Sequence, residues 1–185
     1  NCGLVLISHE EFSELARLCA ENKYQLNTHA IGDKGNQIVI DTYSKYTKDQ
    51  DIRWRIEHAQ MLTSNDLDRI ISNNIVPSMQ PSHCTSDMKW LPERIGNHRL
   101  HRISRWKTLI NKGAKIAGGS DCPIEEGNPL FEFYAAITRQ DHQGYPEKGF
   151  QSQEKVNSLE ALKMMTSWGA HAEFQEKEKG KIIPG

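Results

Sequence analysis

The sequence predicts an α/β fold with about four parallel strands and flanking helices. Short strand-like segments alternate strictly with segments of helical periodicity, roughly 10–14 residues each, and such alternation forms parallel sheets through right-handed crossovers. The chain has 185 residues, enough for one domain or for half of a larger one. It contains no GxGxxG and no GxxxxGKS/T pattern, so nucleotide-binding versions of this layout lack their phosphate loop.

The first half of the chain predicts a leading helix and two strand–helix units. Ser8 and Glu11 have the spacing of a capping box, so a helix is expected from Ser8 to Glu21. Strands are expected at 24–30 and 53–58. Residues 32–35 are expected to form a loop before a helix over 36–46, and Thr63 is expected to open the next helix.

The second half predicts two more strands, at 75–80 and 114–121. A long loop is expected from Pro81 to about Leu100. Helices are expected at 102–111, with Gly113 as the stop, at 129–138, and from Asn157 or Ser158 to about His171. The tail from Glu176 is charged and then turn-like.

The charge balance excludes some classes of partner. Lys and Arg number 23 and Asp and Glu 24, giving a net charge of −1, so we expect neither nucleic-acid binding nor a polybasic membrane surface. No apolar run approaches the ~20 residues of a membrane span, and no signal peptide opens the sequence. The four cysteines form no CxxC pair, and we expect them to be reduced in a cytoplasmic protein. A periplasmic protein is the alternative that stays open.

Three polar side chains occupy the same place in different strand–helix units. His29, His58 and Asp121 each end a predicted strand, and in a parallel sheet such ends lie on one face. Two imidazoles and a carboxylate suit Zn²⁺ or a similar divalent ion. The alternatives are hydrogen-bonded structural histidines and, for Asp121, a helix N-cap. Neighbouring Glu57 is expected to be structural.

Five motifs in order along the chain resemble the amidohydrolase superfamily. The closest branch is the family-3 amidohydrolases, which include N-substituted formamide deformylases and proteins called exoenzyme regulatory proteins. The similarity covers nearly the whole chain. The motifs are residues 28–33, 55–60, 80–83 with 86, 87 and 90, 119–123, and 135–139.

The resemblance implies a (β/α)₈ barrel beside a small β-sandwich. It implies that His29 and His58 are metal ligands, and that Asp121 binds the metal or its water and moves the proton as the catalytic residue. The implied cofactor is one or two divalent ions, with zinc expected. The implied reaction is hydrolysis of a non-peptide C–N bond in an amide-like or cyclic small molecule by metal-activated water. His83 is expected to contact the substrate.

The chain also departs from the family pattern, because it contains no His-x-His. We therefore expect the C-terminal half of the barrel over residues 1–172, and the start of the return to the sandwich over 173–185. Such a chain would lack the N-terminal half of the barrel, bind metal weakly and be inactive by itself. Its open strand edges, near Leu26 and Ile116, predict self-association.

Two other functions stay open at this point. One is a non-catalytic regulatory or binding protein that reuses the amidohydrolase scaffold. The other is a different metal-dependent barrel, such as a phosphotriesterase-like hydrolase, which the motif at 28–33 disfavours.

Overall fold

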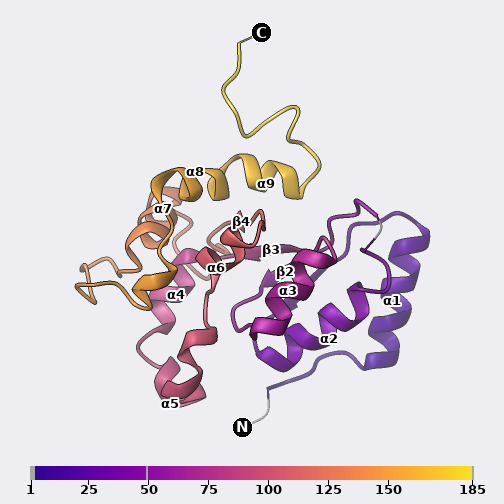
Figure 1. Ribbon diagram of the computed structural model, residues 1–185, viewed down its shortest axis with the longest axis horizontal. Coiled ribbons are helices and arrows are strands. Elements are labelled where there is room, and N and C mark those ends of the chain that lie inside the picture. The colour runs from indigo at the N-terminus through magenta and orange to yellow at the C-terminus, as the bar shows by residue number, and fades with distance from the viewer. Residues whose placement is uncertain (1–2, 49, 185) are drawn as a thin grey trace.

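The computed structural model describes residues 3–48 and 50–184, and at its centre is a parallel sheet with strand order β1-β2-β3-β4 (Figure 1). The strands are β1 (Asn27–Ala30), β2 (Arg55–His58), β3 (Val76–Met79) and β4 (Ala117–Gly118). Each pairs in parallel with the next along the chain. The carboxyl ends of the four strands therefore lie on the same side of the sheet. The predicted α/β fold is confirmed.

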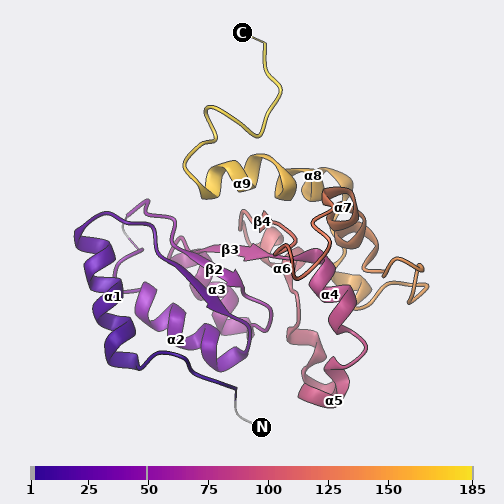
Figure 2. The same ribbon diagram turned by 180° about the vertical axis from the view of Figure 1, so that it is seen from behind.

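The helices form two groups, one near β1 and β2 and the other near β3 and β4 (Figures 1 and 2). Near β1 and β2 lie α1 (His9–Glu21), α2 (Asp33–Tyr43) and α3 (Ser64–Ser72). The others are α4 (Pro81–Asp87), α5 (Leu91–Ile95), α6 (Trp106–Asn111), α7 (Pro129–Thr138), α8 (Ser158–Met165) and α9 (Ser167–Ala172), with the 3₁₀ helices η1 (Asn97–Arg102) and η2 (Ser152–Glu154). Both α8 and α9 contact β4, and the segment after α9 runs away from the sheet in both views.

Side-chain caps start the helices that the sequence marked most clearly. Ser8 caps α1 through a reciprocal pair with Glu11, and Thr63 caps α3 in the same way through Asp66. These boxes satisfy backbone N–H groups that have no partner inside the helix. Both predicted helix starts are confirmed. Gly113, with φ +101°, follows the end of α6 as predicted.

The two faces of the sheet differ in polarity. Ile56 of β2 is fully buried in the core formed with α2 and α3. On the opposite face, Arg55 and Glu57 form an ion pair with 2.9 Å between Nε and Oε1. Because side chains alternate along a strand, Glu57 points away from the side of His58 and has the structural partner expected for it.

The expected loop from Pro81 to about Leu100 is wrong, because this segment folds into α4, α5 and most of η1. Pro81 occupies the first turn of α4, where its fixed φ suits a helix and its missing N–H costs nothing. The carboxylate of Glu132, from α7, then accepts the N–H of Ser82 at 2.9 Å. A partner 50 residues away completes this helix start, and a pattern search along the sequence does not find such a partner.

Three other helix boundaries differ from the prediction. The helix α2 begins at Asp33, because the Gly32 carbonyl already accepts the N–H of Asn36. The helix expected at 102–111 begins only at Trp106. The last helix is divided at Thr166 into α8 and α9. The Thr166 hydroxyl donates to the Leu162 carbonyl at 2.6 Å, a back-bond of the kind that bends helices.

The strand predicted at 114–121 is reduced to the two residues of β4. A side chain at Gly118 would collide with Met165 Cε and would lie 3.1 Å from Met164 Cβ, so α8 packs directly on the strand backbone. Within the described residues, β1 and β4 each pair with one strand only. The predicted open edges are therefore those of β1 and β4.

Two expectations from composition concern the membrane and the cysteines. Among residues 3–48 and 50–184, no helix has both the length and the apolar character needed to cross a bilayer. Cys19, Cys84 and Cys122 are free thiols, as expected for reduced cysteines, and Cys2 lies outside the described residues.

Candidate metal centre

Polar side chains gather at the carboxyl ends of the parallel strands. His29 lies in β1, His58 is the last residue of β2, and Asp121 follows β4. His83 comes from the first turns of α4, directly after β3. The fold thus brings all four residues predicted for the site to the carboxyl ends of the strands.

Three of them form the tightest group. One ligand atom each of His58, His83 and Asp121 lies within 4.8 Å of the others. Nε2 of His58 is 3.9 Å from Oδ2 of Asp121, and the rings of His58 and His83 stack with centroids 5.6 Å apart. The exposure falls from Asp121, which is exposed, through His83 to His58, which is buried. The group therefore opens to solvent on the side of Asp121.

His29 lies beside this group and outside its closest set. Its ring centroid is 4.5 Å from that of His58, at an interplanar angle of 72°. Loss of solvation, and after it the neighbouring His58, lower the pKa of His29, while Asp121 acts in the opposite direction. A lowered pKa favours the neutral imidazole, which is the form that binds metals.

Two of the residues hold an uncommon backbone conformation. His58 has φ +74° and Asp121 has φ +58°, both in the left-handed region that residues other than glycine rarely adopt. Such conformations cost of order 1–3 kcal/mol each and persist where the surrounding structure determines them. Both residues lie at or just after the end of a strand, and Nε2 of His58 and Oδ2 of Asp121 are 3.9 Å apart.

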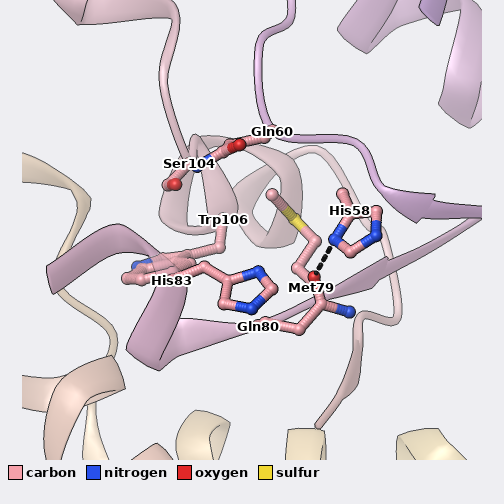
Figure 3. A pocket seen from close by; sticks show the side chains of 7 residues that line it. All are labelled: His58, Gln60, Met79, Gln80, His83, Ser104 and Trp106. Atoms are coloured by element: carbon pink, nitrogen blue, oxygen red, sulfur yellow. Dashed lines mark hydrogen bonds between the residues drawn. The ribbon is translucent and has the colours of Figure 1, made fainter. Parts of the chain in front are cut away.

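The hydrogen bonds around the group leave ligand atoms free. Nδ1 of His58 is 2.9 Å from Oε1 of Gln80, so its Nε2 remains available (Figure 3). Nε2 of His83 is buried and has no hydrogen-bond partner, and Oε1 of Glu125 is 4.0 Å from it. A buried polar atom without a partner is costly unless something outside the chain satisfies it.

These donors fit a divalent metal ion. Imidazole nitrogen and carboxylate oxygen are ordinary ligands of Zn²⁺ and its neighbours in the periodic table. Ligands of one tetrahedral zinc lie about 3.3 Å apart for bonds of about 2.0 Å. The observed 3.9 Å between His58 and Asp121 requires only a small closing movement.

Sequence reasoning missed several polar residues around the group. Gln60 lines the same small cavity as His58 and Gln80 (Figure 3) and donates to Oδ2 of Asp87 at 2.6 Å. Burial raises the pKa of Asp87. Gln60, Gln80 and Asp87 all belong to the motifs at 55–60 and 80–90, and that clustering was the signal that could have found them.

Comparison with known protein families identifies the family of this chain. The model of a family described as "Amidohydrolase family" matches residues 2–185, almost the whole chain. The chain belongs to the amidohydrolase family. The resemblance inferred from the sequence motifs is therefore confirmed.

Curated members of the amidohydrolase family show how much of a longer protein this chain matches. The Bacillus subtilis (strain 168) protein named "Putative amidohydrolase YtcJ" is 32% identical over 183 residues, which cover 99% of this chain and 35% of that protein. An N-substituted formamide deformylase from Arthrobacter pascens is 24% identical over 186 residues, covering 99% of this chain and 34% of the deformylase. The chain thus spans about a third of the length of these relatives.

A solved member of similar structure carries the same fold. A crystal structure of an uncharacterized metal-dependent hydrolase from Pyrococcus horikoshii OT3 superimposes with a TM-score of 0.85 at 25% identity. The match covers 98% of this chain and 36% of the hydrolase. The arrangement of strands and helices described above is therefore shared with a metal-dependent hydrolase.

Proposed function

We propose that the protein is a metal-dependent hydrolase of non-peptide C–N bonds in amide-like or cyclic small molecules. The observation that carries the proposal is the convergence of His58, His83 and Asp121, three residues from separate elements whose ligand atoms lie within 4.8 Å of one another. The amidohydrolase family and the similarity to a metal-dependent hydrolase support it.

The ligands proposed for the metal are His58 and Asp121, together with His29 and His83. A divalent ion bound there would supply a water molecule of lowered pKa and would polarise the substrate carbonyl. Zinc is the ion proposed, because nitrogen and oxygen ligands of this kind suit it. His83 lies nearer the group than expected of a residue that only contacts substrate, so we propose it for either role.

Asp121 is the residue proposed to move the proton. Its carboxylate is exposed on the open side of the group, where substrate and water arrive. It accepts a proton from the attacking water and delivers it to the leaving nitrogen. The buried ring of His58 lies on the inner side of the group.

Metal depletion and replacement tests this function. The purified protein is stripped with a chelator and assayed on N-formyl amines and cyclic amides, before and after zinc is restored. We expect the activity, which is low in this chain alone, to disappear and return, and Asp121→Asn to lower kcat by roughly 10²–10⁴-fold. Asp68→Asn is the matched control, because Asp68 is an exposed residue on α3 that pairs with Lys112. Hydrolysis that survives metal removal contradicts the proposal. In a protein that carries the whole barrel, bound metal without hydrolysis favours the regulatory alternative.

We infer further that the 185-residue chain binds metal weakly and turns over little when it is alone. Within the described residues the sheet is open at β1 and β4, and the chain covers only about a third of the length of its curated relatives. Closure by the rest of such a protein, or by a second copy, would fix the strand ends that carry the ligands. Zinc titration that gives tight stoichiometric binding with turnover contradicts the inference of weakness. Sedimentation that gives a compact monomer at high dilution contradicts self-association.

A further inference from the structure

We propose that Gln80 is a positioning residue that fixes the tautomer of His58 and so keeps the Nε2 lone pair of His58 directed at Asp121. The proposal rests on the metal site of the proposed function, and it adds a residue and a role to that site. It can be tested on the metal-free protein as well as on the loaded one.

The position of Gln80 follows from the order of the strands. It comes one residue after β3 and is the N-cap of α4, with φ −115° and ψ 105°. Because β3 is the parallel neighbour of β2, the end of β3 lies beside His58 at the end of β2. Pro81 follows at once and restricts Gln80 to extended backbone, which places its side chain at this edge.

The two ends of the Gln80 amide are distinguished by their partners. The Ser78 carbonyl can only accept a hydrogen bond, and Nε2 of Gln80 donates to it at 3.4 Å. The amide oxygen Oε1 therefore faces His58, at 2.9 Å from Nδ1 (Figure 3). A flipped amide would place two acceptors against each other at Ser78 and two donors against each other at a His58 protonated on Nδ1.

This orientation determines which ring nitrogen of His58 carries the proton. An amide oxygen only accepts, so Nδ1 of His58 must donate and carries the hydrogen. In the neutral ring the lone pair is then on Nε2, the atom 3.9 Å from Oδ2 of Asp121. The His58 side chain is only 9% exposed, so water competes little with Gln80 for Nδ1.

The opposite tautomer would disable the group. With the proton on Nε2, His58 would donate to Asp121, and the two ligand atoms would satisfy each other. Metal binding would then require the ring to lose that proton or to exchange it between nitrogens. The Gln80 hydrogen bond removes this cost in advance, which is the general effect of an outer hydrogen-bond partner on a metal-binding histidine.

The first test measures the tautomer of His58 in metal-free protein at about pH 8. The ring ¹⁵N shifts of His58, assigned by comparison with His58→Asn, should show the hydrogen on Nδ1 in the wild type. In Gln80→Leu, which keeps the size but lacks the acceptor, the hydrogen should move wholly or partly to Nε2. Gln80→Glu, which keeps an acceptor oxygen, should retain it on Nδ1.

The second test measures zinc affinity by competition with a coloured chelator. Gln80→Leu should bind zinc about 10–100-fold more weakly than the wild type, and Gln80→Glu at least as tightly as the wild type. Gln25→Leu is the matched control. Gln25 is a half-buried glutamine that donates to the carbonyls of Arg53 and Ala172. It precedes β1 and so lies at the amino ends of the strands, away from the metal site. Its replacement should leave the zinc affinity unchanged.

Each outcome decides the proposal. An unchanged His58 tautomer in Gln80→Leu overturns it, and so does an equal loss of zinc affinity in the Leu and Glu variants, which would mean a merely structural role. Circular dichroism checks the fold, and Gln80→Ala replaces the Leu variant if that protein does not fold. If the wild type binds no zinc, the proposed function fails, and the tautomer measurement still decides the role of Gln80.

Discussion

Asn36 should be a major source of stability for the edge of the sheet that carries the site. Its side chain is completely buried at the start of α2. Nδ2 donates to the carbonyls of Ile31 at 3.0 Å, Gly32 at 2.9 Å and Met61 at 3.2 Å. Asn36 therefore ties the segment after β1 to the segment after β2, directly beyond His29 and His58.

The cost of Asn36→Ala can be worked out from these partners. In the variant the Ile31 carbonyl still accepts the N–H of Met61, and the Gly32 carbonyl still accepts the backbone N–H of residue 36. Neither carbonyl is left unpaired, so losing the two side-chain bonds costs about 1 kcal/mol together. The Met61 carbonyl has no other partner among the hydrogen bonds of the described residues, and leaving it unpaired costs about 1–3 kcal/mol. Oδ1 of Asn36 is itself buried without a partner, and its removal offsets about 1 kcal/mol, so the expected loss in the free energy of unfolding is about 1–3 kcal/mol.

Urea and thermal unfolding followed by circular dichroism measure this loss. A loss of about 2 kcal/mol corresponds to a decrease in Tm of about 6 °C for a chain of this size. Asn36→Asp should be worse than Asn36→Ala, because it places a carboxylate against three carbonyls. Asn22→Ala is the control, since Asn22 makes one side-chain bond at the exposed end of α1. A loss for Asn36→Ala no larger than that for Asn22→Ala would refute the reasoning.

Three further predictions concern other elements. Iodoacetamide should label exposed Cys122 in the native protein and spare Cys84, because burial covers the Cys84 thiol and raises its pKa, and equal labelling in peptide mass spectra would contradict this. Burial also raises the pKa of Glu132 above 4.5, so its ionisation costs the folded state stability as the pH rises through the folded pKa. Glu132→Gln should therefore gain stability relative to the wild type as the pH rises above about 4.5 in urea titrations, and a difference that does not change with pH would show that Glu132 is not the cause. Thr63→Ala should lower the free energy of unfolding by about 1 kcal/mol and Thr63→Ser should restore it, unless the cap of α3 contributes nothing.

The helices were predictable where their signals are local. The capping boxes of α1 and α3 each involve residues three positions apart, so the sequence shows both partners. The helix α4 was missed because its start depends on Glu132, which is 50 residues away from Ser82. A segment whose backbone partners come from distant elements has no signal of its own along the chain.

The sequence by itself determined that the chain is an alternating α/β protein of the amidohydrolase family, with His29, His58 and Asp121 at the ends of parallel strands. Periodicity, capping and strand ends are properties of neighbouring residues, so they can be read along the chain. Only the tertiary structure decided that His83 joins His58 and Asp121 in the closest group, that His29 stands beside it, and that Gln80 holds the His58 ring. Distances of a few ångströms between side chains depend on the pairing of strands and on the left-handed backbone at His58 and Asp121. Both result from contacts between residues tens of positions apart, which no local pattern along the sequence shows.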